Sequence, residues 1–210
     1  LELLSPAGSW EALEAAVRSG ADAVYLGGSL FSARANAQNF DHDTLKQAVA
    51  YCHARGVKVH LAVNTILLNH EIEPALDFVA FACTLPVDAV IVQDTGLLHL
   101  LRQAAPTLQI HASTQMSVHT PEGAKLLAEQ GVSRVVLARE LSLREIKEIS
   151  LALKDGGFAH VEIEHFVHGA LCMSVSGQCY FSSLLGSRSG NRGQCAQTCR
   201  LPFSAKGGTG

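Results

Sequence analysis

Four of the six cysteines are crowded near the C-terminal end of the sequence. Cys172, Cys179, Cys195 and Cys199 follow the spacing C-x6-C-x15-C-x3-C. Four thiolates can hold one tetrahedral Zn²⁺ or a [4Fe–4S] cluster. The spacing differs from the paired C-x2-C of a zinc ribbon, and the segment is rich in glycine, as a loop wrapped around a bulky cluster would be. Soft thiolates alone do not distinguish iron–sulfur from zinc, so both remain open here.

The other two cysteines have a different setting. Cys52 is spaced i+7 from Leu45, and Cys83 is spaced i+7 from Leu76, with apolar residues between them at helical intervals. We therefore expect both thiols to lie in the core, on the buried faces of helices. The first residues lack the positive start and long apolar stretch of a secretory signal. This favours a cytoplasmic protein with reduced thiols over a disulfide framework.

The elements that must position the four cysteines alternate regularly. Apolar runs of strand character are separated by amphipathic stretches of helical character, and seven such repeats predict a parallel α/β sheet. The predicted strands are Glu2–Ser5, Ala23–Gly27, Lys58–Asn64, Ala89–Gln93, Gln109–Gln115, Arg134–Ala138 and His160–Glu164.

Alternation within the strands favours a barrel over a doubly wound open sheet. Val59 and Leu61 flank His60, and Ile110 and Ala112 flank His111. An open sheet covered by helices would have two apolar faces, whereas a TIM-like (β/α) barrel turns one face to its helices and the other inward. We expect residues 1–165 to form the first seven strands of such a barrel and residues 166–210 a Cys-rich, cluster-binding loop. We also expect the barrel to be completed beyond residue 210.

A barrel places its active site at the C-terminal ends of its strands. The polar residues predicted there form a cup, and His60 and His111 lie deeper in the same interior. The cup consists of Asn64, Gln93, Asp94, Gln115, Arg139, Glu140 and Glu164. We predict that Gln115, Arg139 and Glu164 are catalytic, because they would orient a substrate, and that Asn64 helps to bind it.

Charge is distributed unevenly. The net charge is −3, yet no Asp or Glu follows Glu164, while Arg188, Arg192, Arg200 and Lys206 all do. A basic segment on an acidic protein indicates an anionic partner such as phosphate or RNA. We therefore assign Arg188, Arg192 and Arg200 to substrate binding. Hydrophobic residues make up 48% of the chain, which is typical of a packed globular protein, and no apolar run is long enough to predict a membrane span.

Four segments carry a family resemblance, and the Cys-containing one is the most specific. Glu-x-Phe-x2-Gly-Ala-Leu-Cys-x4-Gly-x-Cys-x-Phe-Ser, which begins at Glu164, resembles the signature of the collagenase-like peptidases, also called peptidase family U-thirty-two. Phe181 departs from it, because a smaller aliphatic residue is usual there. The segments Leu3–Gly8, Gly20–Gly27 and Ser113–Met116 are also similar to that family. The resemblance spans nearly the whole chain.

The resemblance implies one of two enzyme classes. The family name implies proteolysis, but the sequence has neither a G-x-S-x-G elbow nor an H-E-x-x-H helix. Better understood members are hydroxylases that modify tRNA or ribosomal RNA or that build ubiquinone, with a [4Fe–4S] cluster on four cysteines. For the RNA enzymes the implied oxygen donor is prephenate. Cys172, Cys179 and Cys195 match the ligands, and Cys199 is the nearest fourth, although some members take the fourth ligand from farther downstream.

We therefore expect an iron–sulfur-dependent hydroxylase of tRNA or ribosomal RNA. Two alternatives remain. One is a collagenase-like peptidase that uses a bound metal to activate water. The other is a non-enzymatic RNA-binding protein whose loop is held by a structural zinc.

Overall fold

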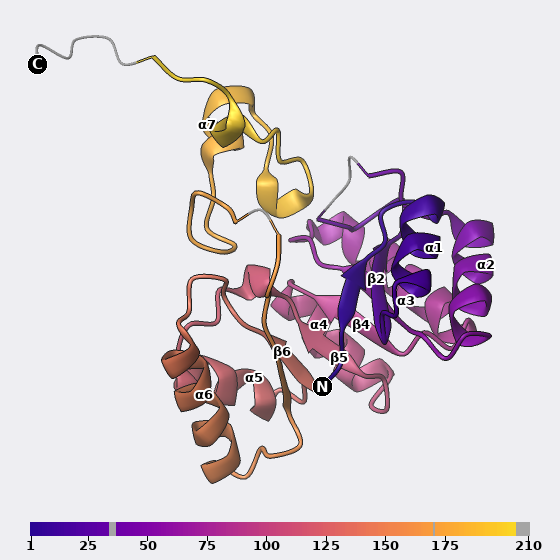
Figure 1. Cartoon of the computed structure of the whole chain (residues 1–210), viewed down its shortest axis with the longest axis horizontal. Coiled ribbons are helices and arrows are strands. Elements are labelled where there is room, and N and C mark those ends of the chain that lie inside the picture. The colour runs from indigo at the N-terminus through magenta and orange to yellow at the C-terminus, as the bar shows by residue number, and fades with distance from the viewer. Residues whose placement is uncertain (34–36, 170, 205–210) are drawn as a thin grey trace, which may run out of the picture.

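The computed structural model describes residues 1–33, 37–169 and 171–204. It contains one seven-stranded sheet in which the strands follow chain order and every neighbouring pair is parallel. The sheet curls into part of a barrel with helices on its outside (Figure 1). The predicted barrel-type α/β fold is therefore confirmed. Ala170 and Lys206, which belong to the predicted motif and basic segment, lie outside the described residues.

The strands agree with the predicted ranges to within a few residues. They are β1 Leu4–Pro6, β2 Ala23–Gly27, β3 Lys58–Val63, β4 Ala89–Val92, β5 Ile110–Ala112, β6 Arg134–Val136 and β7 Glu162–Glu164. The largest difference is at β5, which ends before Gln115. After β5, residues Thr114–Met116 form the 3₁₀ helix η2. The Ser113 hydroxyl accepts a hydrogen bond from the Gln115 amide at its start.

Helices follow the strands in the order that a (β/α) barrel requires. They are α1 Trp10–Arg18, α2 His42–His53, α3 Ile72–Thr84, α4 Thr95–Ala104, α5 Pro121–Glu129, α6 Leu143–Asp155 and the short α7 Phe181–Gly186, with 3₁₀ helices η1 Asn69–Glu71, η3 Gly190–Arg192 and η4 Thr198–Arg200. Local sequence fixes their starts. Ser142 and Glu145 form a capping box at α6, and Thr120 caps α5, whose first residue is Pro121.

The main core lies between the sheet and its helices. Val59, Leu61 and Val63 of β3 belong to it, as do Leu45 and Cys52 of α2. The position predicted for Cys52 is therefore confirmed. The prediction for Cys83 is wrong, because that side chain is exposed. Helix α3 turns Ala75, Val79 and Ala82 toward the core instead.

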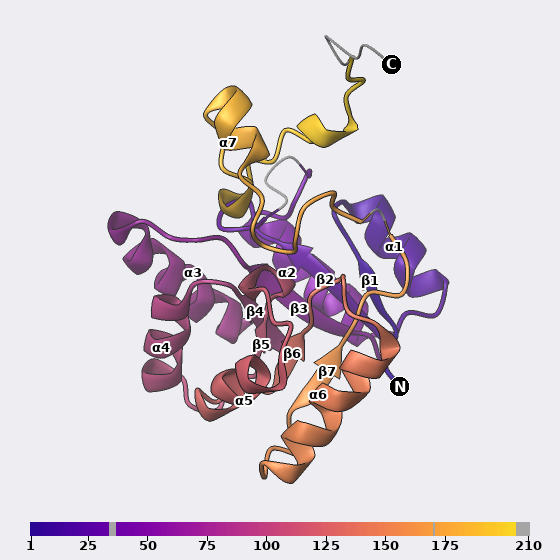
Figure 2. The same cartoon turned by 90° about the vertical axis from the view of Figure 1, so that its left-hand side faces the viewer.

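The Cys-rich segment that follows β7 rises over the C-terminal ends of the strands (Figures 1 and 2). It contains α7, η3 and η4 and little other regular structure. Within the described ranges, the protein contains no helix of the length and apolar character needed to cross a lipid bilayer.

Candidate functional site

Residues from β3 and β5 meet at the mouth of the barrel. The Gln115 side-chain amide donates to the Asn64 carbonyl oxygen at 3.2 Å. The Asn64 side-chain amide approaches the Ser113 hydroxyl at 3.5 Å, and its carbonyl oxygen accepts from the Ala33 amide at 3.0 Å. The structure thus brings together two of the predicted site residues, Asn64 and Gln115, and cross-links them. Their positions are fixed by hydrogen bonds before any substrate binds.

A buried serine attaches the Cys-rich segment to the barrel. Ser176 is fully buried, and its hydroxyl accepts from the Arg139 backbone amide at 3.2 Å and from Arg139 Nε at 3.1 Å. Glu140 Oε1 accepts from the Ser176 amide at 2.8 Å. The Ser117 hydroxyl donates to the Ser176 carbonyl oxygen at 2.5 Å. Arg139 and Glu140, which the sequence places at the barrel top, therefore hold the segment that carries the cysteines.

Gly177 allows the Cys-rich segment to pack closely against the barrel. A Cβ atom at this position would lie 2.1 Å from the Gln115 carbonyl oxygen, and the backbone φ of +75° also favours glycine. The glycine of the family motif therefore packs directly against η2, next to the predicted catalytic residue Gln115.

Arg139 also reaches the first cysteine. Its Nη1 atom lies 3.2 Å from Cys172 Sγ, and its guanidinium lies 5.8 Å from the centre of the Phe166 ring. The guanidinium therefore contacts the sulfur atom that a metal or cluster would bind. This contact connects the predicted catalytic group to the predicted cofactor ligands.

The four clustered cysteines meet the chemical requirements of a metal or cluster site. None forms a disulfide; Cys172 and Cys195 are exposed, and Cys179 and Cys199 are partly exposed. All four lie in one irregular segment beside the barrel mouth. The residues present therefore fit a thiolate-bound group. Among the described residues, however, the set of three or more His, Cys, Asp and Glu side chains close enough to share one metal ion is His60, His111 and Glu164, not the cysteines.

The three arginines predicted to bind phosphate differ in their surroundings. Arg192 forms a two-pronged ion pair with Glu71, with both N–O distances at 2.8 Å, and also donates to the Ile66 carbonyl oxygen at 3.0 Å. Arg200 donates to the Leu171 carbonyl oxygen at 2.5 Å. Arg188 is exposed. Arg192 therefore fastens the Cys-rich segment to the loop after β3, whereas Arg188 and Arg200 are exposed and can meet an anionic partner.

A cavity of about 360 Å³ lies between the strand ends and the Cys-rich segment. The barrel contributes Gln93, Asp94 and Gln115 to its lining, and the segment contributes Gln178 and Asn191. The barrel therefore lines the cavity with amide and carboxylate side chains, and the Cys-rich segment lines it with amide side chains. This is the arrangement expected of a small-molecule site with a few placed polar groups.

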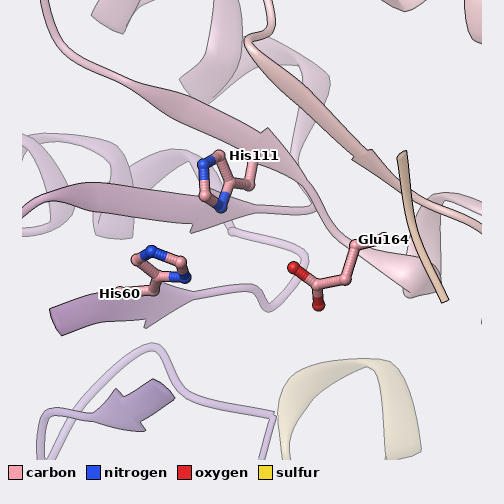
Figure 3. Close-up of side chains that lie close together, drawn as sticks. All are labelled: His60, His111 and Glu164. Atoms are coloured by element: carbon pink, nitrogen blue, oxygen red, sulfur yellow. The ribbon is translucent and has the colours of Figure 1, made fainter. Parts of the chain in front are cut away.

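The third predicted catalytic residue, Glu164, lies lower in the barrel. Its carboxylate accepts a hydrogen bond from Arg134 at 3.1 Å and faces His60 and His111 (Figure 3). Burial raises the pKa of Glu164, and Arg134 partly offsets this rise. Burial also lowers the pKa of His60 to about 4 and that of His111 to about 2. Both imidazoles are therefore neutral at physiological pH.

Sequence reasoning missed three positioning residues: Arg134, Ser176 and Glu71. Arg134 stands at the start of a strand and is only 9% exposed, yet it pairs with Glu2 at 2.7 Å and Glu162 at 2.5 Å. Alternation along β6 was the signal that could have revealed Arg134. The strand register pairs Arg134 with His111 on one side and with Glu162 on the other. Nothing comparable marks Ser176 or Glu71.

The fold and the site define a (β/α) barrel protein with a Cys-rich segment over the barrel mouth. The model of the family described as peptidase family U32 matches residues 8–209. The chain belongs to this family.

Curated relatives carry names from both enzyme classes. The chain is 45% identical over 206 residues to the 23S rRNA 5-hydroxycytidine C2501 synthase of Escherichia coli, with 98% of the chain and 30% of the relative aligned. It is 37% identical to tRNA hydroxylation protein P1 of Bacillus subtilis, with 96% of the chain and 46% of the relative aligned. It is 36% identical to a collagenase of Porphyromonas gingivalis, with 98% of the chain and 50% of the relative aligned. The chain thus spans half or less of each of these relatives.

Among solved structures, the U32 peptidase Mk0906 is similar with a TM-score of 0.58 at 19% identity, covering 78% of this chain and 66% of that one. At this identity the likeness supports the fold alone.

Proposed function

We propose that the protein is an RNA hydroxylase whose [4Fe–4S] cluster is held by Cys172, Cys179, Cys195 and Cys199. The observation that carries this proposal is the attachment of the Cys-rich segment to the barrel mouth. Arg139 contacts both Ser176 and Cys172 Sγ there, beside a cavity with polar walls. Relatives named for rRNA and tRNA hydroxylation support the reaction class.

The cofactor proposal rests on the chemistry of the donor set. When bound, a [4Fe–4S] cluster supplies one-electron transfer. Zn²⁺ held by the same four thiolates remains the alternative. In either case Arg139 would contact the Cys172 ligand atom, and Ser176 would hold the segment in place. Iron and acid-labile sulfide measured after anaerobic purification distinguish the two: a cluster gives both, and zinc gives neither.

The substrate proposal rests on charge and on the cavity. Arg188 is exposed on a segment without carboxylates, and such cations position a nucleic acid through its phosphates. The cavity at the barrel mouth would take the small oxygen donor, for which prephenate is our candidate, with Gln115 as an orienting group. If RNA binds here, log affinity should fall linearly with log salt, by about 0.7 per phosphate contact on single strands. Arg188→Ala should make that slope shallower, while Arg144→Ala on α6, outside the segment, should leave it unchanged.

The second candidate is a peptidase, which the collagenase relative favours. Four protein thiolates on one zinc leave no position for a hydrolytic water, and this counts against metal-dependent proteolysis at the cysteines. One anaerobically reconstituted preparation should be tested, with prephenate supplied as the oxygen donor, for oxygen insertion into RNA and for cleavage of gelatin. We expect hydroxylated nucleosides and intact gelatin. Gelatin cleavage that survives Cys172→Ala, with unmodified RNA, would replace our proposal with the peptidase.

A further inference from the structure

The interior of the barrel contains a polar layer where a barrel of this type usually has apolar side chains. Alternate strands of a (β/α) barrel contribute side chains to one layer, and bulky branched residues dominate such layers. Here β3, β5 and β7 contribute His60, His111 and Glu164. Figure 3 shows the three side chains pointing toward one another from these separate strands. Burying three such groups is costly unless they are paired or bind a ligand.

The two histidines are buried and keep open acceptor positions. His60 is 2% exposed and His111 is 4% exposed, with their ring centres 4.7 Å apart. The Nδ1 atoms of both rings lack a hydrogen-bond partner among the described residues. One ligand atom from each histidine and one carboxylate oxygen of Glu164 all lie within 4.8 Å of one another. Buried nitrogens without a protein partner leave room for a ligand to satisfy them.

Arg134 supplies the support that metal ligands usually have. It donates to Glu164 Oε2 at 3.1 Å, which leaves the second carboxylate oxygen of Glu164 available. Arg134 is itself held by Glu2 and Glu162 at 2.7 and 2.5 Å, and Lys58 by Glu2 at 2.7 Å. Around the proposed ligands, two carboxylates (Glu2 and Glu162) therefore balance two cations (Arg134 and Lys58), so the surroundings add no net positive charge. Outer partners of this kind orient ligating carboxylates.

We propose that His60, His111 and Glu164 bind a divalent first-row transition ion, of the Zn²⁺ or Fe²⁺ class, at a site separate from the four cysteines. Imidazole nitrogen favours these ions over Mg²⁺ or Ca²⁺, and two histidines with one carboxylate are ligands of both zinc and non-haem iron. Metal–ligand bonds of about 2.0–2.2 Å hold tetrahedral ligand atoms roughly 3.4 Å apart, so modest side-chain rotations close the site. Three protein ligands leave at least one position for water.

A route to this site exists from the opposite end of the barrel to the cysteines. A cavity of about 340 Å³ is lined by His60 and His111 together with Lys58, Arg134 and Glu162, which begin β3, β6 and β7. The ion would therefore enter through the N-terminal ends of the strands. This proposal stands independently of RNA hydroxylation and of the cluster.

Cobalt binding tests the proposal, because Co²⁺ bound to thiolates gives an intense charge-transfer band that Co²⁺ bound to imidazole and carboxylate lacks. The metal-free chain would be titrated anaerobically with Co²⁺, and bound metal counted. We expect His111→Gln and Glu164→Gln each to lose one bound equivalent per chain while the thiolate band keeps its intensity. His99→Gln, an exposed histidine of α4, is the matched control and should lose none. Equal Co²⁺ stoichiometry in folded His111→Gln and in the unaltered chain would overturn the proposal.

A second measurement needs no variant. Long-range proton–nitrogen spectra of the imidazoles would be recorded on the metal-free chain and after Zn²⁺ is added beyond the capacity of the cysteines. We expect the nitrogen resonances of His60 and His111 to shift together, while that of His99 stays in place. Unmoved His60 and His111 resonances in the presence of excess Zn²⁺ would show that the layer is a polar core without a metal.

Discussion

Removing the charge of Glu71 should loosen the Cys-rich segment without unfolding the barrel. Glu71 and Arg192 form a two-pronged ion pair, and the adjacent Ile66 amide donates to the Asn191 carbonyl oxygen at 3.0 Å. These contacts join the segment to the loop after β3. Glu71→Gln keeps the shape of the side chain and removes its charge. Glu73→Gln is the matched control, because Glu73 is an exposed carboxylate two residues farther along, in the first turn of α3.

The size of the effect follows from the pKa of Glu71. Hydrogen bonds from Arg192 lower this pKa from 4.5 to about 2. A shift of this size corresponds to about 3 kcal/mol. The Glu71 and Arg192 side chains are 22% and 29% exposed, so solvent screening reduces the contribution to about 1 kcal/mol. Because the folded pKa is depressed, the contribution is complete above pH 4.5 and is lost as the pH falls toward 2.

Native-state hydrogen exchange at the Ile66 amide measures this opening directly. One kcal/mol corresponds to about a fivefold change in the opening equilibrium, so the protection factor in Glu71→Gln should fall about fivefold at pH 7. The protection factor of the unaltered chain should decline between pH 4.5 and 2, and that of the variant should lack this step. Equal protection of Ile66 in Glu71→Gln and in Glu73→Gln would refute the role of the ion pair.

Two further substitutions test the packing. Gly177→Ala would put a methyl group 2.1 Å from the Gln115 carbonyl oxygen and should cost about 1–3 kcal/mol in urea unfolding, whereas Gly186→Ala, with no atom within 4 Å of the added carbon, should be nearly neutral. Cys52→Ala should cost about 1–2 kcal/mol, because its side chain is fully buried, whereas exposed Cys83→Ala should change stability by less than about 0.5 kcal/mol. Both cysteine variants should retain the iron content of the unaltered chain, and iron loss in either would show that the ligand set is wrong.

The sequence was sufficient to predict the barrel because its signals are local and repeated. Residues on β3 alternate strictly, and the helix starts carry caps that do not depend on distant residues. Helix α3 shows where this reasoning fails. Apolar residues of this helix occur on most of its sides, so their periodicity does not single out one buried face. In the structure, small alanines rather than Cys83 face the core. The packing of Phe78 and Phe81 beside the His42 ring is visible only in the folded chain.

The site was only partly predictable. The cysteine spacing and the polar strand ends were visible in the sequence, and the fold brings both to one end of the barrel (Figure 1). Contacts of Ser176 with Arg139 and of Arg192 with Glu71 join residues far apart in sequence through an irregular loop, where no periodicity guides prediction. Glu164 was placed correctly on its strand, but the role of its partner Arg134 was not predicted, because its ion pairs with Glu2 and Glu162 join residues far apart in the sequence.

The central claim is that RNA hydroxylation depends on the cysteine-bound group at the barrel mouth. The most direct test is nucleoside mass spectrometry of RNA incubated with prephenate and anaerobically reconstituted protein, compared among the unaltered chain, Cys172→Ala and Cys52→Ala. We predict a nucleoside heavier by one oxygen atom with the unaltered chain and with Cys52→Ala, and none with Cys172→Ala. Equal amounts of hydroxylated nucleoside from Cys172→Ala and the unaltered chain would contradict the account.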